Sequence, residues 1–345
     1  VFLLKLPPGD RFKTFEKLDF LTFGILASGV ALLCAVLSLG RIDWWLEAPW
    51  IGVASACSLV LIMAGLAIEH NRKNPLLMTR WLGSGVMIRL ALAVVLIRMV
   101  LSEQSTGAVG FMQILNMSYQ QMHTLYVVML AGAIAGLVVS ALTINPAHLL
   151  MPLIISLALM ATGSVMDSFS SNLTRPQNLY ISQFLLGFGG TFFLGPTMVL
   201  GTKNVLTNPR NLVSFSVMFG ICQNLGGLIG AALLGTFQIV REKYHSSMIV
   251  EHLTLLDPRV AARVQSGGSA YGGVIADPEL HNLMGIRSLA TAATREANVM
   301  AYNDVFMLIA IIAILTMLWI FIRSLWLIST TKTAAPPVQP SGVTS

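Results

Sequence analysis

Charged residues are scarce in this sequence. Asp, Glu, Lys and Arg make up only 10% of its 345 residues, whereas soluble domains carry roughly 25%. The mean hydropathy is +0.76. These values exclude an ordinary soluble enzyme, a disordered chain and a nucleic-acid-binding protein. The net charge of +6 comes mostly from bases between apolar blocks, where they predict orientation in a membrane rather than contact with nucleic acid.

Catalytic and metal-binding motifs are also missing. The three cysteines lie inside apolar blocks without a CxxC pair, and no two of the six histidines have HxxxH spacing. The phosphate-binding pattern GxxxxGK[ST] does not occur, which disfavours an ATP-driven pump. A lipid-modifying enzyme would need clustered acids and histidines or a nucleophile with its base at a membrane face. We therefore predict no enzyme activity, no metal and no cofactor.

Long apolar runs are what the sequence has in abundance. A stretch of about 20 apolar residues is the length with which a helix crosses a hydrocarbon core of ~30 Å. We predict an all-α polytopic membrane protein in the lipid bilayer with about eight transmembrane helices. The apolar blocks are 19–39, 50–68, 83–102, 121–141, 148–166, 179–201, 213–236 and 303–327.

The connections predict the topology. Short basic connections lie on one side of the predicted membrane, so the positive-inside rule places both chain ends in the cytoplasm. The segment 237–302 then lies outside; its two ends are patterned as helices and its middle, 266–273, as a flexible linker. The predicted division is a cytoplasmic loop 1–18, two helices within 19–68, a cytoplasmic loop 69–80, helices three to seven within 81–236, the long extracytoplasmic loop 237–302, the last helix 303–327 and a disordered cytoplasmic tail 328–345.

The third apolar block and the stretch directly after it contain three ionisable residues, Arg89, Arg98 and Glu103. In one interpretation the helix ends near Ser102, Glu103 lies at the interface and the arginines extend toward water. In the other, the helix continues to about Asn116, and Arg98 and Glu103 face a wet interior. A carboxyl group beside a permanent cation would then bind and release protons as its surroundings change. Glu103, Arg98 and Arg89 are therefore the proton-coupling candidates.

Uncharged polar residues also lie inside the blocks or, for Gln113, in the stretch after the third block, where they either form interhelical hydrogen bonds or line a substrate path. The candidates for the substrate path are Gln113, Gln183, Gln223 and Asn224. Asp19 and Asp304 begin the first and the last predicted helices, which favours helix capping. Asp167 ends the fifth block and is expected at the membrane interface.

Small residues are spaced for close helix packing. Gly132 with Gly136 and Gly226 with Gly230 form GxxxG patterns, which usually bring two membrane helices together. Pro196, after Gly195, is expected to break the sixth helix; such breaks line cavities in some transporters, but they also occur without function.

The order of several motifs resembles the fourteen-span drug:proton antiporter branch of the major facilitator superfamily, the EmrB-type multidrug efflux permeases. Asp19 is followed by Gly24, Glu69 by Asn74-Pro75-Leu76, and Gln183-Phe184 by Gly187 and Pro196. The seventh predicted helix carries Leu225-Gly226-Gly227, and Asn303-Asp304 opens the last one. The resemblance covers the two central linker helices and the C-terminal six-helix bundle of that family. The N-terminal bundle, which carries the family's main coupling acids, has no counterpart, and Gln223 stands where relatives often have Arg.

This resemblance implies alternating access between two bundles, with the proton gradient as the energy source for exporting amphipathic compounds. It also implies a location in the bacterial inner membrane and work with a periplasmic adaptor and an outer-membrane channel. The loop 237–302 would be the contact for the adaptor. The alternative is a non-transporting or split-half membrane subunit that needs a separate N-terminal bundle as its partner.

Overall fold

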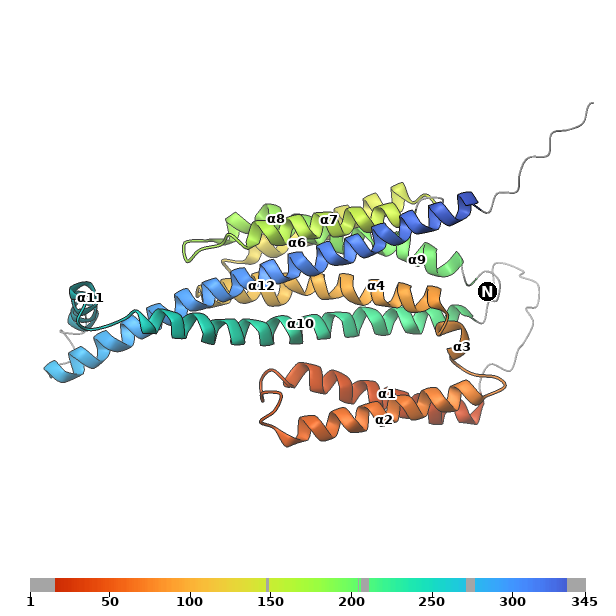
Figure 1. The fold of residues 1–345 in the computed structure, drawn as a ribbon, viewed down its shortest axis with the longest axis horizontal. Coiled ribbons are helices and arrows are strands. Elements are labelled where there is room, and N and C mark those ends of the chain that lie inside the picture. The colour runs from red at the N-terminus through yellow and green to blue at the C-terminus, as the bar shows by residue number, and fades with distance from the viewer. Residues whose placement is uncertain (1–15, 147–148, 204, 206–210, 271–276, 334–345) are drawn as a thin grey trace, which may run out of the picture. The chain divides into compact units, whose positions relative to one another are not determined.

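A computed structural model describes residues 16–146, 149–203, 205, 211–270 and 277–333. This part of the chain contains helices and no strand, so the all-α prediction is confirmed. Eight helical segments are long and apolar enough to cross a membrane, as predicted from the eight blocks. The helices are α1 (Lys17–Leu39), α2 (Pro49–Asn71), α3 (Thr79–Leu82), α4 (Gly85–Ser102), the π-helix η1 (Glu103–Ala108), α5 (Val109–Ile114), α6 (His123–Thr143), α7 (Leu150–Asp167), the 3₁₀-helix η2 (Pro176–Leu179), α8 (Tyr180–Phe192), α9 (Leu194–Lys203), α10 (Asn211–Glu251), α11 (Pro258–Ser269) and α12 (Pro278–Thr333) (Figure 1).

The chain forms two compact units. Unit 1 consists of residues 1–88 and 205–218, and unit 2 of residues 89–204 and 219–345. In unit 1, α1 and α2 form an antiparallel hairpin, drawn in red and orange in Figure 1. The hairpin is tight because Gly29 and Gly65 face the opposite helix. The hydroxyl of Ser58 donates to the carbonyl of Gly29 at 2.7 Å, which satisfies a polar group that lipid cannot.

Unit 2 holds the main apolar core. Side chains from α4, α7, α8 and α12 meet there, and Ile97, Leu157, Leu186 and Ile309 are completely buried. A second cluster adjoins η1 and α5, where the rings of Phe111 and Phe306 meet edge to face. Because lipid tails are as apolar as these side chains, close packing rather than escape from water holds the helices together.

The glycines of both GxxxG patterns lie where helices approach closely. A Cβ atom added to Gly132 or Gly136 of α6 would overlap backbone carbonyls of α8, and one added to Gly226 or Gly230 of α10 would overlap backbone atoms of α4. Pro196 is buried in α9, and the sixth predicted helix is interrupted at Phe193, between α8 and α9.

Three helices are longer than their apolar blocks. The third span runs through α4, η1 and α5 to Ile114, so the interpretation in which it ends near Ser102 is wrong. The seventh continues to Glu251, as its pattern predicted. The last begins at Pro278 instead of residue 303, so the predicted loop 237–302 is largely helical. The prediction of a flexible linker over 266–273 is also wrong as far as Ser269, because α11 ends at that residue. Residues 271–273 lie outside the described part of the chain. Most of the predicted loop 1–18 and of the predicted tail 328–345 lie outside it as well.

Candidate functional site

The third span changes its helical form where it carries its acid. Six residues, Glu103–Ala108, form a π-helix between α4 and α5. A π-helix widens the turn and is often found at functional sites. Here it is accommodated by Gly107, whose missing side chain leaves room for a ring carbon of Phe306 and for the side chain of Glu103. The widened turn sets Glu103 into the middle of unit 2.

At the π-helix, two carboxyl groups accept hydrogen bonds from the same side-chain amide. The side-chain nitrogen of Gln183, on α8, lies 3.1 Å from both carboxyl oxygens of Glu103. The same nitrogen lies 2.8 Å from Oδ2 of Asp167, the last residue of α7. An amide nitrogen has two hydrogens, so it can donate to both carboxyl groups at once. Gln183 thereby joins η1, α7 and α8 in one polar cluster, which we call the carboxyl pair site.

The carboxyl pair site is closed to solvent. Glu103 and Gln183 have 0% of their surface exposed and Asp167 has 1%. Within the described residues, no Lys, Arg or His forms an ion pair with either acid. Two negative charges this close to each other, without a cation, are strongly unfavourable in a low-dielectric interior.

The backbone of Gln183 is tied to η1, whereas the oxygen of its side-chain amide has no partner among the described residues. The side chain of Gln104, also in η1, donates to the backbone carbonyl of Gln183 at 3.2 Å. The side-chain oxygen of Gln183 is buried and accepts no hydrogen bond from the described residues. A protonated carboxyl group is a donor as well as an acceptor. The site can therefore hold a proton and still satisfy its polar atoms through rearranged hydrogen bonds.

Arg98 does not join this cluster. Its Nε donates to the backbone carbonyl of Gln223 at 3.2 Å, on α10, and none of the ion pairs of the described residues links it to Glu103. The separation follows from the helix: five residues place Arg98 on a different face of the third span from Glu103. Arg89, nine residues before Arg98, is exposed on the same span.

The other substrate-path candidates lie apart from the carboxyl pair site. Gln113 is exposed and donates to the hydroxyl of Tyr119 at 3.2 Å. Asn224 is exposed and donates to the carbonyl of Gly220 in its own helix. Gln223 accepts a hydrogen bond from Arg98 at its backbone carbonyl. Of the four substrate-path candidates, only Gln183 contacts Glu103 among the described residues.

Asp304 lies inside a helix and does not cap one, so the predicted capping is wrong. Because α12 begins at Pro278, Asp304 is more than 20 residues inside it. Its carboxylate pairs with Arg241 at 2.6 Å and with Nε2 of His245 at 2.7 Å, both on α10. This cluster ties α10 to α12 beyond the apolar core.

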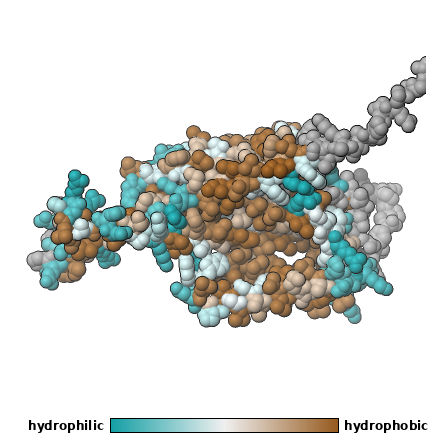
Figure 2. Space-filling view, viewed as in Figure 1, coloured by the Kyte–Doolittle hydropathy of each residue, from teal (hydrophilic) through white to brown (hydrophobic). Residues whose placement is uncertain are grey.

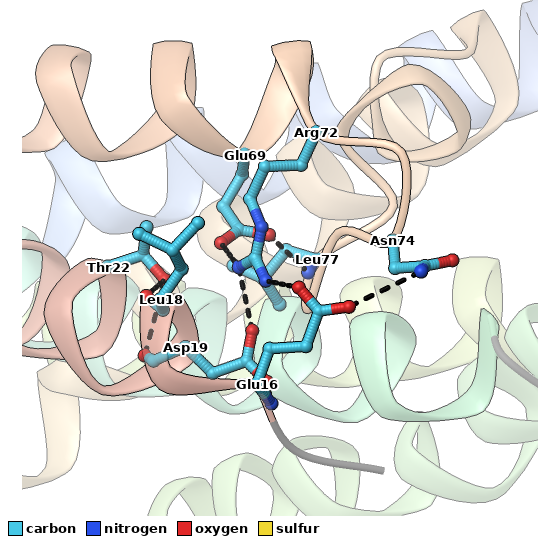
Figure 3. Close-up of polar contacts among 8 residues, drawn as sticks. All are labelled: Glu16, Leu18, Asp19, Thr22, Glu69, Arg72, Asn74 and Leu77. Carbon is cyan, nitrogen blue, oxygen red and sulfur yellow. Dashed lines mark hydrogen bonds and ion pairs between the residues drawn. The ribbon is translucent and has the colours of Figure 1, made fainter. Parts of the chain in front are cut away.

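Asp19 does take part in capping and also belongs to a second charged cluster, in unit 1. At the start of α1 its carboxylate accepts the backbone N–H of Glu16 at 2.8 Å. It also pairs with the guanidinium of Arg72 at 2.7 Å, which lies between Asp19, Glu69 and Glu16 (Figure 3). Burial alone would lower the pKa of Arg72, but its hydrogen bonds to the three carboxylates raise that pKa above the ordinary value. Arg72 thus remains a cation that fixes the α1–α2 hairpin at its open end.

Asp167 is the residue of this site that the sequence did not mark as functional. Its place at the membrane interface stays a prediction, and in the structure it is buried beside Gln183. A signal was present, because the buried residues of α7 recur every three or four positions and this stripe includes Met160, Ser164 and Asp167. No local sequence pattern indicates that its hydrogen-bond partner is Gln183 on α8.

Comparisons give no family for this chain. No protein-family model matches it, and neither does any curated protein at the significance required. Among the described residues, no group of three or more His, Cys, Asp or Glu side chains is placed to hold a metal ion. The proposal for its function therefore rests on the geometry of the carboxyl pair site and on the sequence.

Proposed function

We propose that this membrane-embedded chain is part of a secondary transporter in which the carboxyl pair site binds and releases the coupling proton. The observation that carries the proposal is the shared amide of Gln183 between Glu103 and Asp167, buried without an ion pair to any described cation. Ionisable groups inside a membrane bundle are energetically expensive and mark proton or substrate pathways.

The chemistry of the site supports exchange of a proton rather than bond-making. With both acids ionised, the pair carries two negative charges in a closed interior, which favours uptake of one proton. If water or a cation reaches the pair in another conformation, ionisation becomes favourable and the proton leaves. Such coupling between access and protonation is what a proton-driven antiporter requires.

Two features of the helices support movement of this kind. The π-helix that holds Glu103 can revert to α-helix with a shift of register, which would move the carboxyl group relative to Gln183. The sixth span is also interrupted, between α8 and α9, and interrupted helices form the substrate sites of several transporter folds.

The substrate class is proposed from the sequence resemblance to the drug:proton antiporters. We propose export of amphipathic compounds across the bacterial inner membrane, driven by proton entry, with both chain ends in the cytoplasm. A periplasmic adaptor and an outer-membrane channel are the partners that the resemblance implies. The alternative of a non-transporting subunit stays open to the same test.

The test uses inverted membrane vesicles that contain the chain with any partner that co-purifies with it. Ethidium uptake would be followed by fluorescence after an inward-acid pH gradient is imposed. We expect uptake with the natural sequence and none with Glu103→Gln, whereas Glu251→Gln, an exposed acid at the end of α10, transports normally. Normal uptake by Glu103→Gln would refute the role of the site, and absence of uptake by the natural protein would favour the non-transporting subunit.

A further inference from the structure

A basic cavity lies in unit 2, away from the carboxyl pair site. It has a volume of about 830 Å³ and lies between α11, the N-terminal part of α12 and the loops that follow α5 and α7. Pockets for small molecules commonly measure about 300–1,000 Å³. Figure 2 shows hydrophilic residues gathered over α11 and the start of α12.

Four of the lining residues are arginines: Arg175, Arg263, Arg287 and Arg295. The carboxylate of Glu296 is the only acid among the lining residues of the described chain, which leaves a formal excess of three positive charges on the wall. Guanidinium groups bind phosphate and carboxylate through paired, planar hydrogen bonds. The wall is therefore suited to anions.

Glycines build this wall by bringing two helices together. A Cβ atom on Gly268 of α11 would overlap the carbonyl of His281, and one on Gly285 of α12 would overlap the carbonyl of Val264. The absence of side chains lets α11 lie directly against α12. Arg263, one residue before Val264, then reaches the same cavity as the arginines of α12. The glycine-rich stretch thus acts in packing, and its composition does not produce a flexible linker up to Ser269.

Three of the four arginines on this wall are not neutralised by ion pairs within the described part of the chain. Arg263, Arg287 and Arg295 form no ion pair with any residue of the described chain. The Nε of Arg295 is buried and has no hydrogen-bond acceptor among the described residues, a state that is unfavourable for a donor removed from water. Glu296 instead accepts a hydrogen bond from Asn172. An oxygen from a bound anion would satisfy Arg295.

The charge of the wall indicates how many anionic groups the ligand carries. Arg287 and Arg295 are eight residues apart on α12, which corresponds to about 12 Å along the helix. One phosphate group carries at most about two negative charges, which is fewer than the formal excess of three positive charges on the wall. A ligand with at least two anionic groups can bind both arginines at once.

We propose that this cavity binds a small polyanion, a soluble molecule or a lipid headgroup with at least two phosphate or carboxylate groups. The proposal does not rest on proton-coupled transport, because it concerns binding alone and residues outside the carboxyl pair site. The loops after α5 and α7 end membrane-spanning helices, so both a soluble anion and a headgroup can reach the cavity.

Calorimetry on the full chain, purified in neutral detergent, tests the soluble form of the ligand with sodium pyrophosphate and with citrate. Retention of cardiolipin, which carries two phosphates, in phosphatidylcholine nanodiscs tests the lipid form. We expect one of these probes to bind saturably with one molecule per chain. Arg287→Gln and Arg295→Gln should each weaken binding about tenfold, the loss expected for one charged hydrogen-bond partner.

Arg259→Gln is the matched control, because Arg259 is an exposed arginine of α11 that does not line the cavity. It should bind the probe as the natural protein does. Equal weakening by Arg259→Gln and Arg287→Gln would mean diffuse attraction and would overturn the proposal, as would the absence of saturable binding by all three probes. Since Arg287 is exposed, its replacement should leave helical content unchanged, and Arg295→Lys, which keeps the charge but loses the planar fork, should bind with intermediate affinity.

Discussion

Replacing Arg72 with methionine is expected to destabilise the α1–α2 hairpin of unit 1. The guanidinium pairs with Asp19 at 2.7 Å, with Glu69 at 2.9 Å and with Glu16 at 3.0 Å. Methionine keeps an unbranched side chain about as long as the aliphatic part of arginine and removes the charge. The substitution therefore leaves carboxylates without their cation and changes the packing little.

The exposed fractions of the partners decide the magnitude. The side chain of Glu16 is 50% exposed, so its pair contributes about 0–1 kcal/mol. The side chain of Glu69 is 0% exposed, and breaking its buried pair from one side costs about 3–5 kcal/mol. The backbone N–H of Leu77 also donates to Glu69, at 3.2 Å, which holds that acid in place when its cation is gone. We expect a loss of about 3–5 kcal/mol in the stability of the hairpin.

Hydrogen–deuterium exchange of the detergent-purified protein measures this loss locally. Amides of α1 and α2 that open with the hairpin should exchange roughly a hundredfold to a few thousandfold faster in Arg72→Met, since 1.4 kcal/mol corresponds to a factor of ten. The triple variant Asp19→Asn, Glu69→Gln, Arg72→Met removes the uncompensated charges and should recover most of the protection. Unchanged exchange in Arg72→Met, or no recovery in the triple variant, would refute this reasoning.

Three further outcomes follow from the packing of unit 2. Gly136→Ala places a methyl group against the backbone of α8 and should lower the free energy of unfolding, measured by thermal melting, by about 1–3 kcal/mol. Gly220→Ala, with no atom within 4 Å of its Cβ position, should leave that free energy unchanged. Equal effects of the two variants would contradict the steric argument. Gln183→Ala removes the donor shared by two buried carboxyl groups and should lower stability by about 1–3 kcal/mol, with no change in melting as the contradicting result. Asp304→Asn should cost only about 1 kcal/mol or less, because Asp304 and Arg241 are each about one-third exposed; a larger loss in a melting experiment would show that the pair is shielded from water.

The number of membrane helices was predictable because hydropathy and length decide it directly. Blocks of about twenty apolar residues have one stable solution in lipid, a helix with all its backbone hydrogen bonds internal. The continuation of the third span past Glu103 was one of two interpretations, and the structure selects it. The π-helix was not predictable, since a one-residue shift in hydrogen bonding leaves no mark on hydropathy.

The candidate site was half predictable. Glu103 and Gln183 were singled out because polar groups inside apolar blocks are expensive, but nothing local pairs them with each other. Asp167 was placed at the interface because it ends a block, and its burial depends on how α7 packs against α8. The capping role of Asp304 was wrong for a related reason: its partners on α10 are about 60 residues away, and block boundaries do not locate helix starts outside the membrane.

The glycine-rich segment shows where composition misleads. Glycine has low helix propensity, so a run of small residues favours a flexible linker in any local analysis. In α11 the same small residues allow close contact with α12, and tertiary packing outweighs the propensity. The basic cavity, which depends on that contact, was therefore invisible in the sequence.

The central claim is that Glu103 and Asp167 together bind a proton that is exchanged during the working cycle. Infrared difference spectroscopy of the protein in lipid, recorded across a pH titration, detects the C=O stretch of protonated carboxyl groups directly. We predict a titrating carboxyl band that is present in the natural protein and in Glu251→Gln and is lost in the double variant Glu103→Gln, Asp167→Asn. A band that persists unchanged in the double variant would contradict the account.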